Sequence, residues 1–276
     1  MATRTMRALL FAVTLTLSAL PLPPAARAEN PPAELAERVS AQLVEQAQAK
    51  LAVQDALHAD PAIVRTRLGE AVDPAQGSIA GPIERGILKL TLQTQAAYAY
   101  VQPYREPNDW AHRNYCGAGA AITLLSHWDT NLPQTADIDQ LGREMGLDPN
   151  AGVWIYRIVG PVNARLNQYL GQAVNWYCYG KAASLDDLRW MIEVDIKQNA
   201  VPFITGLMTY GLPGWGSRNV GHIVTVYGYT REPDGTEKIS YIDTAPPASG
   251  YRGWILNVVE LGQFWRAVSG NSAQVW

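Results

Sequence analysis

The sequence predicts an α+β protein whose main domain begins with helices and ends with antiparallel strands. Three observations support this fold class. Apolar residues recur at helical spacing in several stretches between 116 and 199. Short runs rich in β-branched and aromatic residues follow, from 201 to 258. Among them, a turn-forming Glu-Pro-Asp-Gly sequence at 232–235 separates two strand-like runs, which is typical of a hairpin.

The chain opens with a segment typical of a cleavable export signal, residues 1–28. Arg4 and Arg7 precede an apolar run over 8–20, and Ala-Arg-Ala at 26–28 fits the small-x-small cleavage rule. The run is shorter than the ~20 residues that usually span a bilayer, although a retained N-terminal anchor is the alternative. We therefore expect cleavage near Ala28, a secreted or periplasmic protein, and no membrane insertion of the mature chain.

Residues 29–95 predict a helical appendage with a linker. No aromatic residue occurs between Phe11 and Tyr98, whereas nine tryptophans and thirteen tyrosines lie from Tyr98 onward. Large aromatic side chains dominate core burial, so the packed domain is expected over 96–276. The appendage carries a narrow apolar stripe over 32–57, followed by a link rich in proline and glycine. It is interpreted as a pro-segment, a partner-binding helix or a tether.

The elements of the main domain follow from capping signals and periodicity. A helix should follow Cys116, and Pro161 should break the apolar helical stretch that ends at Leu170. Ser184 is the expected N-cap of the clearest helix, which reaches Asn199. The remaining predictions are a helix at 137–145 capped by Thr135, strands at 201–207, 223–230, 237–243 and 253–258, and a helix at 259–268.

Charge and ligand spacing exclude two classes of function. Removal of residues 1–28 leaves 19 basic and 25 acidic residues, a net charge of −6. A nucleic-acid surface needs a basic patch, so no nucleic-acid partner is expected. The two cysteines and four histidines are scattered without the paired spacing of zinc ligands. We expect no metal and no cofactor, and the sequence leaves the oligomeric state open.

Cys116 is the candidate nucleophile. It stands in the run Asn-Tyr-Cys-Gly-Ala-Gly-Ala-Ala, where turn-forming residues meet a helix-prone stretch. Converging N–H groups and the dipole at a helix N-terminus favour a thiolate there. Gly117 would leave room for a substrate carbonyl. The Cys116 N–H is one expected oxyanion donor, and a side-chain amide, Gln102 or Asn108, is the expected second donor.

His222 is the candidate base. A glycine, Gly221, precedes it, an apolar strand follows it, and Asp243 ends the next predicted strand. A carboxylate in that place can fix the tautomer and orientation of the imidazole. His112, on the loop before Cys116, is a second candidate base. Alternatively, His222 is a histidine at a strand edge without a catalytic role. The other two histidines lie in the appendage and far along the helix that follows Cys116.

An exported chain with two cysteines also invites a Cys116–Cys178 disulfide. With that bond, the domain would be a catalytically inactive binding module. The loop at 210–219, which contains Trp215, would then bind a peptide or glycan. If the protein is an enzyme, the expected substrate-binding residues are Gly117, Gly221 and Trp215.

Two blocks of this sequence resemble the peptidase C39-like family of papain-like cysteine peptidases. Asn-Tyr-Cys116-Gly-Ala-Gly-Ala-Ala is similar to that family's nucleophile motif, and the segment from Gly221 to Asp243 resembles its histidine–aspartate segment. The resemblance covers roughly 98–268. It implies a papain-like fold with a helical half carrying Cys116, an antiparallel β half carrying His222 and Asp243, and thiol peptidase chemistry.

The sequence departs from that family where the oxyanion glutamine commonly stands, because Trp110 occupies this position. Gln102 would serve only if the intervening loop is longer. The resulting expectation is an exported cysteine hydrolase that acts on a peptide or protein through an acyl-thioester intermediate. Amide transfer or deamidation on the same fold uses the same intermediate and stays open.

Overall fold

The computed structural model describes residues 95–276 and four residues of the N-terminal segment, 44, 47, 48 and 50. The predicted signal segment 1–28 and most of the predicted appendage 29–95 therefore lie outside the described residues. The described α-helices are α4 (Cys116–Leu125), α5 (Ile138–Glu144), α6 (Val159–Leu170), α7 (Leu185–Ile192) and α8 (Leu261–Val268). The strands are β1 (Gln95–Tyr98), β2 (Tyr179–Lys181), β3 (Phe203–Met208), β4 (Gly221–Arg231), β5 (Glu237–Ile242), β6 (Leu256–Glu260) and β7 (Ala273–Val275).

The strands form one antiparallel sheet in the order β2-β7-β3-β4-β5-β6. The long strand β4 is shared between two neighbours on one side. Its first part, Gly221–Val226, pairs with β3, and its last part, Gly228–Arg231, pairs with β1. The mixed α+β class predicted from the sequence is confirmed, and a strand begins at Gln95, next to the predicted domain start.

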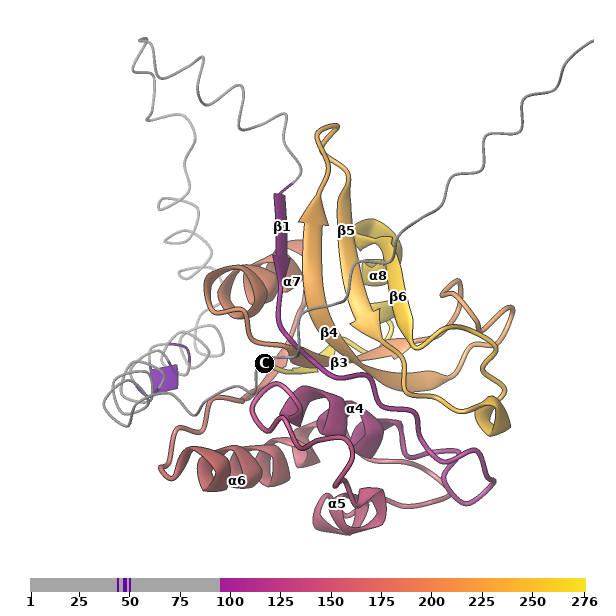
Figure 1. Cartoon of the computed structure of the whole chain (residues 1–276). Coiled ribbons are helices and arrows are strands. Elements are labelled where there is room, and N and C mark those ends of the chain that lie inside the picture. Colours follow the sequence, from indigo (N-terminus) through magenta and orange to yellow (C-terminus); the bar gives the residue numbers. More distant parts are fainter. Residues whose placement is uncertain (1–43, 45–46, 49, 51–94) are drawn as a thin grey trace, which may run out of the picture.

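One side of the molecule is purely helical, and the other combines strands with helices. In Figure 1, α4, α5 and α6 lie together on one side, while the β4–β5 hairpin, β6 and α8 form the other. Side chains alternate across the sheet between two buried clusters. Ile204 and Ile223 join the cluster around α4, whereas Phe203 and Val224 join the cluster that contains α7 and α8. The sheet thus separates two hydrophobic cores, and its strand β4 packs against α4.

Small residues let α4 pack closely against β4. The helix is buried along nearly its whole length, and the Thr225 hydroxyl of β4 donates a 2.8 Å hydrogen bond to the Ala120 carbonyl. A Cβ atom added to Gly117 would lie 2.2 Å from Val153 Cγ1 and 3.4 Å from Ile223 Cδ1. Glycine at 117 therefore allows the first turn of α4 to approach the start of β4.

The helix boundaries confirm one predicted cap and correct two other predictions. Ser184 caps α7 and accepts a hydrogen bond from the Asp187 amide. Asp137, not Thr135, caps α5, because its extended backbone aims the carboxylate at the Gln140 amide. Pro161 does not break α6, because it lies in the first turn, where its missing N–H needs no partner.

Two further features differ from the sequence-based expectation. The helix predicted to reach Asn199 changes after Ile192 into a π-helical segment, Glu193–Gln198. The short strands β1, β2 and β7 were not predicted. Strand β7 lies between β2 and β3, and the backbones of Cys178 and Trp276 exchange hydrogen bonds of 2.9 and 3.1 Å. The C-terminal residues therefore complete the sheet.

Lys50 ties the N-terminal segment to the main domain. Its ammonium group lies 2.9 Å from the Asp195 carboxylate, and both side chains are buried. The same nitrogen lies 4.8 and 4.7 Å from the ring centroids of Trp176 and Trp276, within the range of cation–π attraction. Among the residues that the structure describes, no helix combines the length and apolar character needed to cross a membrane.

Candidate active site

Cys116 is the first residue of α4, as predicted. The first N–H groups of an α-helix have no partner within the helix, so the donors of this turn point beyond the helix end. The helix dipole adds a partial positive charge there. The thiol is half-buried and lies at the wall of a cavity. Cys116 is therefore accessible from the cavity and lies beside these N–H donors.

His222 and Asp243 come from neighbouring strands of the sheet. His222 is the second residue of β4, and Asp243 follows the last residue of β5. The antiparallel pairing of β4 with β5 brings both side chains to one end of the hairpin. His222 Nε2 lies 2.8 Å from Asp243 Oδ1, with exposed fractions of 5% and 0%. The sequence-predicted pair is thus in direct contact.

Charges and hydrogen bonds hold this pair in its ionised form. Burial lowers the pKa of His222, but the charge and hydrogen bond of Asp243 and the hydrogen bond and charge of Cys116 raise it well above 6.5. Burial raises the pKa of Asp243, but His222 and Trp215 outweigh this and hold it below its usual value. With Nε2 turned to Asp243, Nδ1 is the ring nitrogen available to Cys116. The geometry thus places the His222 ring between the sulfur-bearing first turn of α4 and the Asp243 carboxylate.

Trp215 holds Asp243 from the other side. Its indole N–H donates a 2.9 Å hydrogen bond to Asp243 Oδ2, and its ring centroid lies 4.8 Å from that of His222. The Ala245 amide donates to Oδ1 over 3.1 Å. Trp215 is buried, so its indole orients the carboxylate while one edge lines the cavity. Its role in substrate binding stays a prediction.

Trp215→Phe should destabilise the fold by about 1.5–3 kcal/mol, because it leaves one oxygen of a buried carboxylate without its donor. The pKa of Asp243 should rise, since the Trp215 hydrogen bond helps to lower it. Urea unfolding at neutral pH measures the loss. Trp254→Phe is the matched control, because Trp254 is 84% exposed. Equal stability of the two variants would contradict the orienting role.

A cavity of about 280 Å³ opens in front of Cys116 and His222. Its walls combine the first turn of α4, the start of β4 and loops from both halves of the molecule. The exposed indole of Trp110 stands at its rim. The lining residues are Glu106, Trp110, Arg113, Asn114, Cys116, Ala151, Gly152, Trp215, Arg218, Val220, Gly221, His222, Ala245, Ala248 and Ser249.

The structure does not place Gln102 beside Cys116, so the prediction of Gln102 as oxyanion donor is wrong. Its backbone N–H donates to the hydroxyl of Ser126, which follows the last residue of α4. Its side-chain amide donates to the Thr130 carbonyl over 3.0 Å. A ten-residue helix is about 15 Å long, and Gln102 lies at the end opposite to the nucleophile.

The other predicted amides and glycines have mixed outcomes. The side-chain oxygen of Asn108 accepts a hydrogen bond from the Ala248 amide, and Asn108 does not line the cavity. The space beside Gly117 is filled by Val153, which corrects the expectation that it leaves room for substrate. Gly221 is exposed, lines the cavity and has open space around it. Gly221 therefore remains a candidate contact for a substrate.

The rival base and the predicted disulfide are not supported. His112 contacts Asp109 and Asp139 and does not line the cavity. Within residues 95–276, Cys116 and Cys178 are not joined by a disulfide. The Cys178 thiol instead donates to the Trp276 carbonyl over 3.4 Å, in a different core cluster from Cys116. Among the described residues, Cys116 is thus a cysteine outside any disulfide.

Glu106 is the residue of the cavity that sequence reasoning missed. Its side chain is 2% exposed, and its carboxylate accepts a 2.5 Å hydrogen bond from the Thr244 hydroxyl. The Glu106 amide also donates to the Thr244 carbonyl, which fixes this segment beside the end of β5. The only sequence signal is one acidic residue between Arg105 and Pro107 in a stretch without periodicity.

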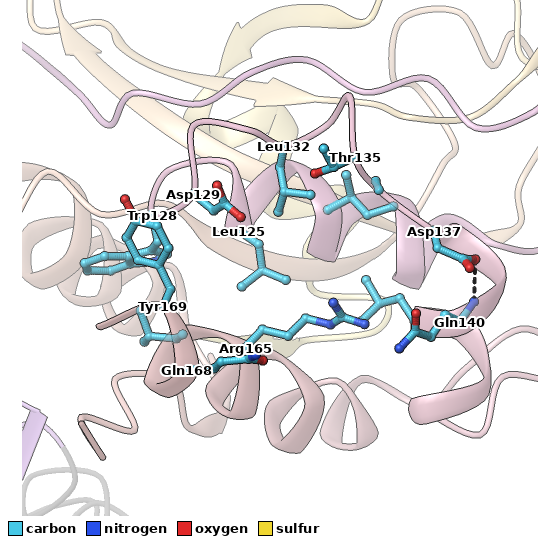
Figure 2. Close-up of a pocket in the computed structure, with 14 residues that line it drawn as sticks. Leu125, Trp128, Asp129, Leu132, Thr135, Asp137, Gln140, Arg165, Gln168 and Tyr169 are labelled. Atoms are coloured by element: carbon cyan, nitrogen blue, oxygen red, sulfur yellow. Dashed lines mark hydrogen bonds between the residues drawn. The ribbon is translucent and has the colours of Figure 1, made fainter. Parts of the chain in front are cut away.

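A second cavity of about 330 Å³ lies among α4, α5 and α6 (Figure 2). Leu125 and Leu132 form part of its apolar lining, and Arg165 extends along it. Arg165 pairs with Glu144 at 2.9 Å. The cavity contains neither cysteine nor histidine, so it offers no nucleophile or base. Over the described residues, no group of three or more potential metal ligands occurs.

Comparisons with known proteins give weak similarity. No family model matches the chain, and no curated protein sequence matches it. Similar solved structures include a recombinant stem bromelain precursor, with a TM-score of 0.39, 12% identity, and coverage of 64% of this chain and 66% of that chain. The bromelain protease from Ananas comosus in complex with the E64 inhibitor gives a TM-score of 0.38, 13% identity, and coverage of 63% and 92%. Similarity at this level does not assign the chain to a family.

Proposed function

We propose that the protein is an exported cysteine hydrolase of papain-like architecture that cleaves peptide bonds. Cys116 is the nucleophile, His222 the general base and acid, and Asp243 the residue that orients His222. One observation supports this function above all others: His222 is hydrogen-bonded to the carboxylate of Asp243 and lines the same cavity as Cys116, whose presence raises the pKa of His222. The motif resemblance to peptidase C39-like proteins adds support from the sequence.

The reaction follows from these contacts. The Cys116 thiolate attacks the carbonyl carbon of the substrate, and the carbonyl oxygen becomes an oxyanion next to the N-terminus of α4. The imidazolium of His222 then gives its proton to the leaving amine, and the C–N bond breaks. Neutral His222 next takes a proton from water, which hydrolyses the thioester and restores the Cys116 thiolate. Asp243 keeps its charge throughout and stabilises the imidazolium.

The cavity suits a chain segment better than a buried small ligand. It opens between the helical and β halves and carries both aromatic and charged side chains at its rim, including Trp110, Arg113 and Arg218. A peptide backbone could lie along the exposed Gly221, which has open space around it. Transfer of the acyl group to an amine instead of water would use the same residues. Amide transfer is therefore an outcome that the substrate assay must separate from hydrolysis.

Alkylation of the native, unreduced mature protein with iodoacetamide at pH 6 tests the nucleophile. Cys116 should be labelled rapidly, because it lies at the N-terminus of α4 and lines the same cavity as His222, the proposed base. His222→Ala should slow the labelling by at least about tenfold. Peptide mass mapping identifies the labelled cysteine.

Cys178 serves as the internal control, because it is buried and should be labelled only after unfolding. Equal labelling rates for Cys116 in the wild-type protein and in His222→Ala would contradict the hypothesis that His222 activates Cys116. If Cys116 were labelled only after reduction, the result would support the alternative hypothesis of a disulfide-linked binding module. Digestion of a peptide library, with and without an added amine acceptor, then separates hydrolysis from transfer.

A further inference from the structure

A tetrahedral oxyanion needs more than one hydrogen-bond donor. The backbone N–H of Cys116 supplies one of them. The three upstream amides do not supply another in this structure. Gln102 donates to the Thr130 carbonyl and Asn114 donates to the Pro149 carbonyl, while Asn108 does not line the cavity. The site therefore lacks an amide side chain in the donor role, although its cavity contains another buried polar group, the Glu106 carboxyl.

Glu106 lies on the face of α4 that carries the nucleophile. A Cβ atom added to Gly119 would lie 2.9 Å from Glu106 Oε1. Gly119 is three residues after Cys116, and residues three apart are neighbours on one helix face. Glu106, Cys116 and His222 also line the same cavity. The carboxyl thus lies beside the first turn of α4, where the oxyanion would form.

The contacts of Glu106 distinguish its two oxygens. The Thr244 hydroxyl donates to Oε1, so Oε1 acts as an acceptor. In the part of the chain that the structure describes, no residue donates a hydrogen bond to Oε2. If the Glu106 carboxyl is neutral and Oε1 accepts the hydrogen bond from Thr244, the proton lies on Oε2. An Oε2–H group would be a donor without a protein acceptor.

The surroundings of Glu106 favour its neutral carboxyl form up to about pH 7. Burial raises the pKa of Glu106 to about 7, and the negative charge of Asp243 acts in the same direction. The Thr244 hydrogen bond and the positive charges of His222 and Arg105 act in the opposite direction. The Arg105 guanidinium itself donates to the Ala245 carbonyl. Near pH 7, a substantial fraction of the molecules therefore carries neutral Glu106.

We propose that neutral Glu106 is a further catalytic residue, whose Oε2–H donates a hydrogen bond to the oxyanion formed on attack by Cys116. The proton stays on Glu106 through the reaction, because the role is donation and not proton transfer. This inference rests on the proposed function. It predicts that ionisation of Glu106 removes the donor and places a second negative charge beside the oxyanion. Activity should therefore fall as the pH rises through the pKa of Glu106.

The test is the pH profile of kcat/KM for a fluorogenic peptide amide, measured for the wild-type protein and for Glu106→Gln. The wild-type profile should fall above about pH 7. Glutamine keeps an N–H donor and an acceptor for Thr244 but does not titrate. The alkaline limb of Glu106→Gln should move to higher pH, to the titration of His222, whose pKa is also raised. Below pH 7, its kcat/KM should stay within about tenfold of the wild-type value.

Thr244→Val provides a second variant with the carboxyl retained. Loss of the hydroxyl removes a hydrogen bond that lowers the pKa of Glu106, so the alkaline limb should move to higher pH. An unchanged limb in both variants would overturn the role of Glu106. A Glu106→Gln protein that is equally impaired at every pH would also overturn it.

Iodoacetamide labelling separates this inference from the proposed function. Alkylation of Cys116 forms no oxyanion, so Glu106→Gln should be labelled at a rate within a few-fold of the wild-type rate. Rapid labelling with an unchanged alkaline limb would reject Glu106 as donor and keep the cysteine hydrolase. Slow labelling of Cys116 in the wild-type protein would reject the hydrolase itself, and the inference with it.

Discussion

Cys116→Ala is expected to lower kcat/KM for peptide hydrolysis by at least about 10⁴-fold. Alanine cannot form the thioester, so only the weak acceleration from binding and oxyanion donors remains. The fold should persist, because the thiol is half-buried at a cavity wall and α4 is rich in alanine. Steady-state hydrolysis of a fluorogenic peptide, with circular dichroism as the folding check, measures this loss.

His222→Ala should cause a loss of similar size, because thiolate and imidazolium act as one unit. The double variant Cys116→Ala/His222→Ala should be no worse than either single variant, since a group that works as a unit can be lost only once. Cys178→Ala is the matched control, because Cys178 lies in the other core cluster and does not line the cavity. Comparable loss in Cys178→Ala, or full activity in Cys116→Ala, would contradict the assignment of Cys116.

The local signals in the sequence located most of this site. Cys116 was found because a change from turn-forming to helix-forming residues marks a helix start, and α4 begins there. His222 and Asp243 were found because the turn at 232–235 fixes which strands pair, and β4 pairs with β5. Candidate catalytic residues on helices and strands can be predicted from periodicity, because the pattern fixes the position of each side chain along the element.

Residues in irregular segments could not be placed in the same way. Between β1 and α4 the chain has no helix or strand, so spacing in the sequence says little about distance in space. Gln102 lies near the end of α4, and Glu106 lies beside Gly119. This segment thus runs along α4 towards Cys116, and of these two residues only Glu106 lines the cavity. The short strand β7 was missed for a related reason, because three residues show no period.

Lys50→Met is expected to destabilise the protein by about 3–5 kcal/mol at pH 7.5. Lys50 and Asp195 are both buried, and removal of one partner leaves a buried charge without compensation. The variant also loses the cation–π contacts with Trp176 and Trp276. Methionine keeps most of the side-chain volume, so the loss reports the charge more than a cavity. Urea unfolding measures the change in free energy of unfolding.

The loss should depend on pH with a definite sign. Burial raises the pKa of Asp195 to about 6, even though the charge and hydrogen bond of Lys50 lower it. The folded state therefore binds more protons than the unfolded state between about pH 4 and 6, and the contribution of Asp195 to stability falls as the pH rises through this range. Removal of the Lys50 charge raises this pKa further. The destabilisation by Lys50→Met should thus be small below about pH 6 and should grow as the pH rises above 6, towards the higher pKa of Asp195 in the variant.

Lys197→Met is the matched control, because Lys197 also pairs with a carboxylate, Glu193, and lies 5.6 Å from the ring centroid of Tyr229. That pair is exposed, with side-chain fractions of 34% and 42%, so its loss should change the stability by less than about 1 kcal/mol. Equal effects of the two substitutions would show that Lys50 does not stay buried in solution. A larger effect of Lys50→Met that vanishes in acid would instead mean that the N-terminal segment is held to the main domain by one desolvated ion pair.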